Sequence, residues 1–458
     1  MSPALRLALA RLLAADELRT DPATLASHGG DKWLSHHEPD VAALPRSTES
    51  VVRILKFARR HRVPLTARGA GFGYVGGCVP VRGGIALSLI RLNRIREISA
   101  TDFVAVVQPG VITERLQNEV EKRGLYYPPD PASRADCSIG GNLATNAGGP
   151  RCLKYGVTQD YVLGLEVVLA DGTRVRLGGR THKNKTGFDL HRLFVGSEGM
   201  LGIVTEATLK LLPLPPFRAC LAVGFADLRS ATQAIHGIFR AGFLPSALEL
   251  ADAFTLAAAR KRTGSRLLAG CDALCIVELD GQERSVRQEI AVLAQVIAAH
   301  RPVVLRRGFG HDGCEQFWQL RREFSYALRD TGLTKLNEDV VVPRGKLEAL
   351  FQLAAHLQRK HKLPIACFGH AGDGNIHVNV MLDSSSRDQL ARSGRVLDDL
   401  FKGVLALGGS ITGEHGIGLA KKPWWPLAVS AEARALHQVV KQALDPRGIL
   451  NPGKFLDP

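Results

Sequence analysis

The chain has 458 residues, of which 45% are hydrophobic and 22% charged, enough for two or three domains with hydrophobic cores. No run of about 18 apolar residues occurs, which excludes a membrane-spanning helix. The net charge is +15, but Lys and Arg are spread along the chain without a basic arm or zinc-finger spacing. We therefore expect a protein that binds a small anionic ligand, and no nucleic acid.

The eight cysteines are scattered and form no Cys-x-x-Cys pair, which argues against an iron–sulfur cluster or a thiolate zinc site. We interpret them as reduced thiols. Residues 1–15 have leucines at helical spacing but lack the apolar core and cleavage site of a secretory signal. An organelle-targeting segment is the alternative to an amphipathic helix docked on the body. The expected location is cytoplasmic, or peripheral at the inner membrane.

In the first half of the chain, the residue pattern predicts short helices and strands between glycine-rich loops. Residues 1–35 form a helical lead-in, and Ser47 has the features of a helix cap before an amphipathic segment. A further helix is predicted at 113–122, and strands at 63–66, 85–89, 103–107, 161–169 and 173–177. The proline-rich stretch 212–216 is the clearest break, and we place the main domain boundary there.

Beyond this break the pattern alternates regularly between the two element types. Strands are predicted at 221–225, 247–251 and 274–279, and helices at 229–240 and 284–299. Such alternation favours an antiparallel α+β layer.

The first glycine loop, residues 68–77, contains the pattern G-x-G-x-x-G at residues 71–76. A Rossmann fold requires a helix to open directly at that loop. Here Pro80 and the pair Gly83-Gly84 follow, so no helix can begin and we reject that fold. Consecutive backbone N–H groups would still suit an anion, with Arg68 adding positive charge. A plain series of tight turns is the alternative.

Two further glycine clusters strengthen the cofactor interpretation. Residues 128–149 combine glycines with Ser, Thr and Asn, and residues 196–202 read Gly-Ser-Glu-Gly-Met-Leu-Gly. Small residues let the backbone approach a flat ligand closely, and the hydroxyl and amide groups can donate hydrogen bonds. The three loops together indicate one large phosphate-bearing cofactor.

The order of these motifs resembles the PCMH-type FAD-binding domain of the vanillyl-alcohol-oxidase flavoprotein superfamily, over about residues 36–216. The resemblance rests on Arg68-Gly-x-Gly, Pro129-Asp-Pro, Ile139-Gly-Gly-Asn, Ala147-Gly-Gly, Lys154-Tyr-Gly, Leu165-Glu-x-Val, Gly196-Ser-Glu-Gly and Thr205-Glu-Ala-Thr. It implies FAD contacts at Arg68, Gly69, Ala70, Gly71, Phe72, Gly73, Pro129, Asp130, Ser133, Ser138, Gly140, Gly141, Asn142, Ala144, Gly148, Gly199, Ile203 and Asn451.

This chain departs from the superfamily at one point of the first loop. Phe72-Gly73 stands where members usually carry Thr or Ser, so one hydroxyl contact to FAD is in doubt. The loop also lacks the His through which some members bind flavin covalently. The resemblance therefore implies non-covalent FAD.

The last third of the chain holds the densest polar motifs. Residues 369–381 end in a strand pattern that places His377 and Asn379 on one face. His370 lies across a glycine turn from His377, and residues 413–416 read Gly-Glu-His-Gly. Two imidazoles and one carboxylate suit a divalent metal with open coordination positions. A pair of buried, hydrogen-bonded histidines is the alternative.

These motifs resemble the C-terminal substrate domain of the glycolate oxidase, D-lactate dehydrogenase and D-2-hydroxyglutarate dehydrogenase group. The resemblance implies that His370, His377 and Glu414 bind the metal, with zinc expected and manganese or iron as alternatives. It assigns the base to His415 and the substrate contacts to Arg321, Ser325, Lys335 and Asn379. Arg322 is the alternative to Arg321, because the spacing to Lys335 is one residue shorter than in the group.

The function that these residues favour is FAD-dependent oxidation of a 2-hydroxy acid to the 2-keto acid. Glycolate, D-lactate or a related D-2-hydroxy acid would be the substrate, with hydride transfer to flavin N5 assisted by the metal and the His base. A metal hydrolase is one alternative, but it leaves the glycine loops unexplained. The other is a flavin-binding subunit of a larger dehydrogenase complex with little activity alone.

The expected fold class is α+β: a two-subdomain PCMH-type FAD-binding domain followed by an α+β substrate (cap) domain with an antiparallel sheet. We place the lead-in at 1–35, the FAD domain at 36–216, the substrate domain at 217–440 and a segment returning to the FAD domain at 441–458. The electron acceptor would be a quinone, a cytochrome, another flavoprotein or an iron–sulfur partner subunit. We expect a homodimer or a member of a hetero-complex.

Overall fold

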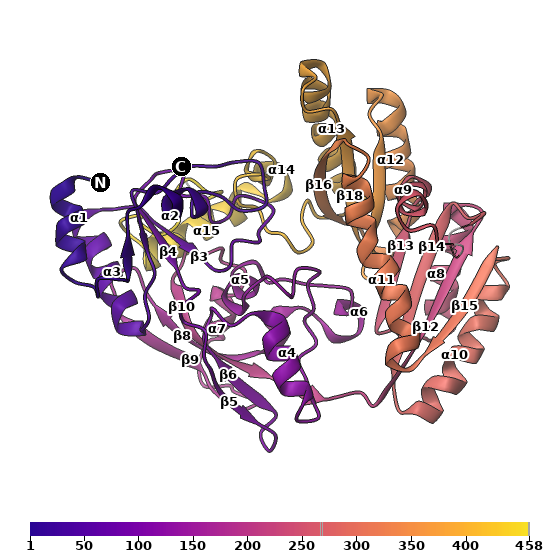
Figure 1. Ribbon diagram of the computed structural model, residues 1–458, viewed down its shortest axis with the longest axis horizontal. Helices are drawn as coiled ribbons and strands as arrows, with labels where there is room; N and C mark the ends of the chain where they lie inside the picture. Colours follow the sequence, from indigo (N-terminus) through magenta and orange to yellow (C-terminus); the bar gives the residue numbers. More distant parts are fainter. Residues whose placement is uncertain (266, 268, 457–458) are drawn as a thin grey trace. The chain divides into compact units, whose positions relative to one another are not determined.

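The computed structural model describes residues 1–265, 267 and 269–456, which divide into two compact units (Figure 1). The first unit contains Met1–Gly148, Val157–Leu214 and Glu414–Pro458. The second contains Gly149–Gly156 and Pro215–Gly413. The chain therefore leaves the first unit and returns to it.

Two sheets form the frame of the first unit. One has the strand order β1-β2-β4-β3 and the other, which is antiparallel, the order β5-β6-β10-β8-β9, while β11 pairs with β7. The strands are β1 (Leu18–Arg19), β2 (Val41–Ala43), β3 (Leu65–Arg68), β4 (Ile85–Ser88), β5 (Ile95–Ser99), β6 (Val104–Val107), β7 (Leu125–Tyr126), β8 (Val162–Val168), β9 (Arg174–Gly178), β10 (Ile203–Lys210) and β11 (Leu212–Pro213).

The helices of the first unit are mostly short. They are α1 (Pro3–Ala10), α2 (Pro22–Ser27), α3 (Thr48–His61), α4 (Thr113–Glu121), α5 (Ile139–Thr145), α7 (Leu190–Phe194), α14 (Trp425–Ala428) and α15 (Ala431–Leu444), with 3₁₀ turns at Thr158–Tyr161 and Lys422–Trp424. Ser47 caps α3 by accepting from the Ser50 N–H at 3.1 Å, as the sequence predicts. Helix α1 docks Leu9 into the core that α3 shares with β2, β3 and β4.

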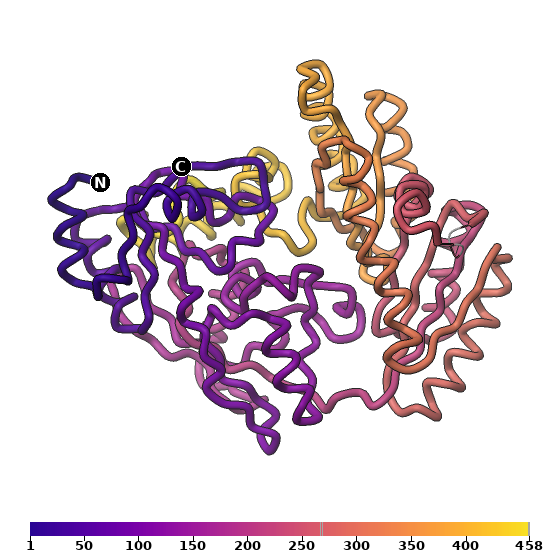
Figure 2. The backbone as a smooth tube through the Cα atoms, in the orientation of Figure 1, coloured from indigo at the N-terminus to yellow at the C-terminus, as the bar shows by residue number. Residues whose placement is uncertain are grey.

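The C-terminal segment is built into the frame of the first unit (Figure 2). The Leu65 N–H on β3 donates to Ile449 O at 2.8 Å, and the Asn451 N–H donates to Leu65 O at 2.7 Å. Residues 449–451 thus lie alongside the strand that leads into the first glycine loop.

One continuous antiparallel sheet forms the second unit, with the order β15-β12-β14-β13-β17-β18-β16. The strands are β12 (Phe217–Phe225), β13 (Ala247–Ala251), β14 (Ala273–Gly281), β15 (Val304–Phe309), β16 (Thr334–Val341), β17 (Ile365–His370) and β18 (Asn375–Leu382). The helices are α6 (Cys152–Tyr155), α8 (Leu228–Arg240), α9 (Ala253–Thr263), α10 (Glu283–Ala298), α11 (Gly310–Arg329), α12 (Leu347–His361) and α13 (Arg387–Ala406), and a 3₁₀ turn covers Arg344–Lys346. The expected α+β class with an antiparallel sheet is confirmed.

Helix α11 covers one face of this sheet and positions several polar side chains. Its buried residues share a hydrophobic core with β12, β13, β14, β17 and helix α9. Cys314, Trp318, Arg321 and Ser325 follow one another at intervals of four, three and four residues, so they lie on one side of the helix. A single helix therefore presents all four to the same face of the sheet.

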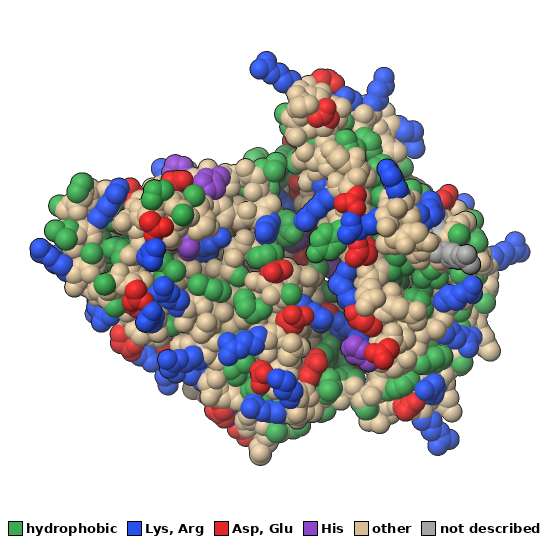
Figure 3. Space-filling view, viewed as in Figure 1, with side chains coloured by type: hydrophobic (Ala, Val, Ile, Leu, Met, Phe, Trp, Pro, Cys, Tyr) green, Lys and Arg blue, Asp and Glu red, His purple; other side chains and the backbone are tan. Residues whose placement is uncertain are grey.

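The surface agrees with the expectation of scattered charge. Figure 3 shows Lys and Arg side chains spread over the visible face of each unit, with Asp and Glu between them. Within the described part of the chain, no helix is long and apolar enough to cross a membrane.

Candidate active site

Hydrogen bonds join the three glycine loops of the first unit. The Ala70 N–H in the first loop donates to Ser138 Oγ at 3.3 Å. In the third loop, the Gly196 and Glu198 N–H groups donate to Leu143 O and Ala144 O, both at 2.8 Å. Segments 69–73, 138–146 and 196–199 therefore form one surface.

This surface is made largely of backbone because side chains would not fit. A Cβ on Gly69 would lie 2.5 Å from Ser138 Oγ, and one on Gly140 would lie 2.6 Å from Pro109 Cβ. Gly71 has φ +78°, a conformation that side chains disfavour. Tightly apposed backbone of this kind suits a flat cofactor with phosphate groups, so the loops fit FAD.

Polar side chains fix the first loop from two sides. The Arg68 guanidinium donates to Gly30 O and contacts Cys78 Sγ at 3.2 Å. The Asn451 amide donates to Gly77 O at 2.9 Å and to Glu198 O at 2.7 Å. Asn451 therefore joins the first loop, the third loop and the C-terminal segment.

The other expected FAD contacts occupy several environments. Asn142 is buried and donates to Thr113 Oγ1 at 2.7 Å, whereas Lys32 lies 4.4 Å above the ring of Phe72. Ile203 belongs to the hydrophobic core. All the residues expected to contact FAD lie in the first unit: Arg68, Gly69, Ala70, Gly71, Phe72, Gly73, Pro129, Asp130, Ser133, Ser138, Gly140, Gly141, Asn142, Ala144, Gly148, Gly199, Ile203 and Asn451.

The loop that carries His415 also belongs to the first unit. Its imidazole stacks on the Tyr74 ring, with centroids 5.3 Å apart and an interplanar angle of 26°. Glu198 accepts from the N–H groups of Ile417 and Gly418. His415 is thus anchored to the first and third glycine loops.

In the second unit, a polar patch interrupts the apolar face covered by α11. His370 on β17 and His377 on β18 are buried, with ring centroids 5.6 Å apart. Glu249 on β13 contacts His370 Nδ1 with Oε1 and accepts from Arg321 Nε with Oε2, both at 2.5 Å. Burial alone would raise the pKa of Glu249, but the charges of His370 and Arg321 outweigh it and lower the pKa to about 2.

The structure distinguishes Arg321 from its neighbour Arg322. The Arg321 guanidinium is held by Glu249 and lies 4.8 Å above the ring of Phe368. Arg322 is exposed and pairs with Glu315. Of the two candidates, only Arg321 reaches the patch that contains the histidines.

Lys335 and Ser325 meet beside this patch. Lys335 Nζ donates to Ser325 Oγ at 2.8 Å, which joins β16 to α11. Burial, followed by the charges of Arg329 and Arg321, lowers the pKa of Lys335 to about 8.

Asn379 lies on the same strand as His377 but is turned toward the backbone. Its side chain is fully buried, and its amide donates to Ala366 O and His377 O, both at 3.0 Å. This geometry gives Asn379 a role in fixing β18 next to His377.

Glu414 stands at the point where the chain passes from the second unit to the first. It is peptide-bonded to Gly413, whose N–H donates to Asp339 Oδ2 on β16 at 2.8 Å. The sequence assigns Glu414 to the same metal site as His370 and His377 of the second unit. The N, N and O donors fit a divalent cation.

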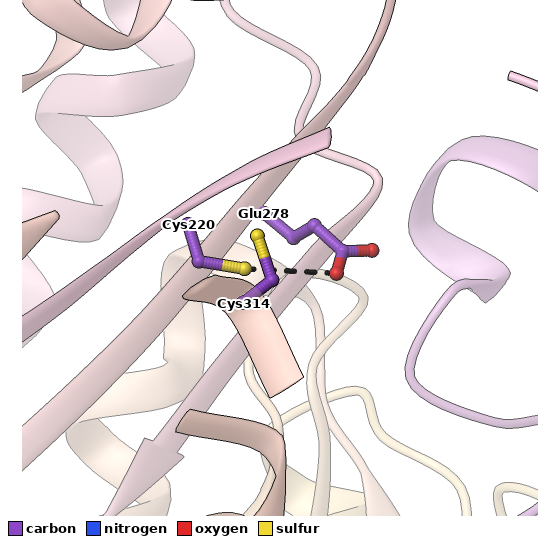
Figure 4. Close-up of side chains that lie close together, drawn as sticks. All are labelled: Cys220, Glu278 and Cys314. Atoms are coloured by element: carbon purple, nitrogen blue, oxygen red, sulfur yellow. Dashed lines mark hydrogen bonds between the residues drawn. The ribbon is translucent and has the colours of Figure 1, made fainter. Parts of the chain in front are cut away.

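Another group of ligand-type side chains lies deeper under α11, formed by Cys220, Glu278 and Cys314 (Figure 4). Glu278 accepts from Trp318 Nε1 at 2.7 Å and from Arg151 Nε at 3.0 Å. Because its carboxylate is already neutralised and hydrogen-bonded, we interpret this group as a buried structural network.

Sequence reasoning missed two carboxylates that support the site. Glu249 lies in the apolar strand Ala-Leu-Glu-Leu-Ala, where a buried charge was the available signal. Glu198 belongs to a recognised motif, but its contact with residues 417–418 depends on segments far apart in the chain.

Comparison with known proteins identifies the family. Residues 39–178 match the family described as FAD binding domain, and residues 214–455 match that described as FAD linked oxidases, C-terminal domain. The chain belongs to the FAD-linked oxidases. It is therefore an FAD-dependent oxidoreductase, as the motifs imply.

Curated relatives of this FAD-linked oxidase cover nearly the whole chain. It is 39% identical to glycolate oxidase subunit GlcD of Bacillus subtilis, over 91% of this chain and 89% of that protein. It is 32% identical to D-lactate dehydrogenase of Anaerostipes hadrus, over 97% of this chain and 94% of that protein.

A solved structure of p-cresol methylhydroxylase with substrate bound shares the fold. Its TM-score is 0.82 at 19% identity, over 99% of this chain and 96% of that one. This likeness supports the architecture of the FAD-linked oxidase.

Proposed function

We propose that this FAD-linked oxidase converts a 2-hydroxy acid, namely glycolate, D-lactate or a related D-2-hydroxy acid, into the 2-keto acid. The names of the relatives support this substrate class. The observation that carries the proposal is the patch in the second unit, where Arg321 and His370 flank Glu249. It combines a group that binds carboxylates with a group that binds metals.

Arg321 and Lys335 are proposed to bind the substrate carboxylate. Glu249 occupies Nε of Arg321, which leaves the two terminal nitrogens for a bidentate contact. Lys335 supplies a second positive charge, and Ser325 orients its ammonium group.

His370, His377 and Glu414 are proposed to hold a divalent metal, which when bound would lower the pKa of the substrate hydroxyl. Zinc suits two nitrogen donors and one oxygen, and manganese or iron are alternatives. His415 then takes the hydroxyl proton, while its stacking on Tyr74 limits ring rotation.

The glycine loops are proposed to hold FAD without a covalent link, and bound FAD would accept the hydride from the α-carbon. Segments 69–73 and 138–146, which the Ala70 N–H joins by donating to Ser138 Oγ, are proposed to line the FAD site.

Steady-state turnover with a dye as electron acceptor tests the proposal. The purified protein should oxidise glycolate or a D-2-hydroxy acid. It should oxidise each D-2-hydroxy acid faster than the corresponding L-enantiomer. Arg321→Ala should raise KM strongly. Arg322 is the neighbouring exposed arginine, and Arg322→Ala should leave KM unchanged. The proposal is contradicted if none of these 2-hydroxy acids is oxidised, or if the two arginine variants change KM equally.

A role within a larger complex is the second candidate, because the Bacillus subtilis relative is named a subunit. Electrons would then pass to an iron–sulfur partner subunit, or otherwise to a quinone, a cytochrome or another flavoprotein. Flavin reduction by substrate without dye turnover would favour this candidate over the isolated enzyme.

A further inference from the structure

We propose that Glu249 is a positioning residue that couples the metal-binding histidine His370 to the carboxylate-binding Arg321. This inference rests on the proposed function and extends it to a residue that touches neither substrate nor metal. One carboxylate would thereby set both the orientation of a metal ligand and the position of the substrate clamp.

The sheet register places Glu249 beside His370. Strands β13 and β17 are antiparallel, with Leu250 opposite Gly369 and Ala251 opposite Phe368. The same register puts Glu249 opposite His370, with both side chains on the face covered by α11. Arg321 reaches this pair from α11, so three elements meet at one carboxylate.

The contact with His370 determines which ring nitrogen is available. Oε1 of Glu249 lies 2.5 Å from Nδ1 of His370. A carboxylate only accepts, so Nδ1 must carry the proton and donate it. Nε2 then presents its lone pair, which is the state that a metal requires.

The contact with Arg321 leaves the substrate-binding end of the guanidinium open. Oε2 of Glu249 accepts from Nε at 2.5 Å, and the guanidinium lies 4.8 Å above the Phe368 ring. The two terminal nitrogens therefore keep a fixed direction. Because Glu249 is only 1% exposed, bulk water does not compete with it as the acceptor.

A purely structural role for a buried Glu–Arg pair is the competing explanation, and Glu278 provides its matched control. Glu278 on β14 lies under the same helix, is 1% exposed and is held by Arg151 and Trp318. Its partners do not include His370 or Arg321. The two carboxylates thus share burial and pairing, but only Glu249 contacts the candidate site.

Glu249→Gln breaks the coupling whichever way the new amide points. If its NH₂ group faces His370, Nδ1 must accept and the proton moves to Nε2, which blocks metal binding. If the NH₂ group faces Arg321, the guanidinium loses its acceptor. At least one of the two affinities must therefore fall.

The experiment compares wild type, Glu249→Gln, Glu249→Asp and Glu278→Gln as FAD-loaded proteins. Zn²⁺ affinity is measured by competition with a chromophoric chelator, and affinity for a 2-keto acid by its perturbation of the flavin absorption. Thermal melting reports stability for all four. Glu249→Asp keeps the charge, but its side chain is one methylene too short to bridge both partners. It therefore provides the test of the coupling if Glu249→Gln does not fold.

We expect either Glu249 variant to lower the Zn²⁺ affinity about 10- to 100-fold or to weaken keto-acid binding by a similar factor. Glu278→Gln should lower the melting temperature and change neither affinity. Unchanged affinities in both Glu249 variants, or equal losses in Glu278→Gln, overturn the inference. Absence of Zn²⁺ binding in the wild type would instead refute the metal site of the proposed function, and the coupling with it.

Discussion

Glu198 accepts hydrogen bonds from the backbone N–H groups of Ile417 and Gly418 with its two carboxylate oxygens, at 2.7 and 2.8 Å. Its own N–H donates to Ala144 O at 2.8 Å. One residue of the third glycine loop therefore ties the loop of His415 to the surface that fits FAD.

We predict that Glu198→Gln impairs turnover by releasing this loop. The glutamine oxygen can accept from one of the two N–H groups of Ile417 and Gly418, but the glutamine NH₂ is a donor and cannot accept from the other. The free energy of unfolding should fall by about 1–3 kcal/mol, and kcat by roughly 10- to 100-fold as His415 shifts. Glu206→Gln is the control, since the carboxylate of Glu206 lies 3.9 Å from Arg96 Nε. Normal kcat in Glu198→Gln would refute the anchoring role.

His415→Ala and Arg321→Ala should separate proton removal from substrate binding. Loss of the base should lower kcat on the order of 10²–10⁴-fold, because the proton leaves in the transition state. Loss of the arginine should act mainly on KM, because the carboxylate is charged throughout the reaction. Near-normal kcat in His415→Ala, together with abolished kcat and unchanged KM in Arg321→Ala, would contradict both roles.

The pH dependence of kcat/KM should report Lys335. Its pKa of about 8 lies below the ordinary 10.5 because of burial and then the charges of Arg329 and Arg321. As pH rises through about 8, the free enzyme loses this positive charge and should bind the carboxylate less well. Lys335→Arg should remove that decline, since arginine stays protonated. A profile that is the same in both proteins would exclude Lys335 from the clamp.

The same shift has a consequence for stability. Because the folded pKa is lower than the unfolded one, the unfolded chain binds more protons between about pH 8 and 10.5. This group therefore makes the protein more stable as pH rises through that window. Urea unfolding across this pH window measures the free energy of unfolding. That free energy should rise more steeply with pH in the wild type than in Lys335→Met.

Elements with a clear hydrophobic period could be predicted from the sequence, whereas glycine-rich ones could not. The strand at 247–251 was predicted with the bounds that β13 has, and the helix at 229–240 begins one residue earlier as α8. Helix α5 was missed because Gly140 and Gly141 disfavour helices. Its formation depends on Ser138, which caps it by accepting from the Gly141 N–H.

The candidate site could be predicted where its residues are neighbours in sequence. His370 and His377 flank one turn, so the local pattern indicated their proximity. Glu249 lies 121 residues before His370, and no local spacing could connect them. The contact exists only because β13 and β17 are adjacent in the sheet.

Acid precipitation should release FAD into the supernatant. The first glycine loop, residues 68–77, contains no His to form a covalent link. A yellow pellet after precipitation would show that FAD is covalently bound.

Elemental analysis should find about one metal ion per chain in the wild type. His377→Ala removes one of three proposed ligands and should lose the metal while FAD stays bound. Full activity of a chelator-treated protein without detectable metal would refute the metal site.

Anaerobic mixing of the FAD-loaded protein with a single 2-hydroxy acid tests whether the protein oxidises that acid by reducing its flavin. Glycolate, D-lactate or another D-2-hydroxy acid should bleach the flavin absorption in the absence of any acceptor and yield the 2-keto acid. Deuterium at the α-carbon should slow the bleaching, because that carbon–hydrogen bond breaks as the hydride leaves. A flavin that stays oxidised with every 2-hydroxy acid, although dithionite reduces it, would contradict 2-hydroxy-acid oxidation by this protein.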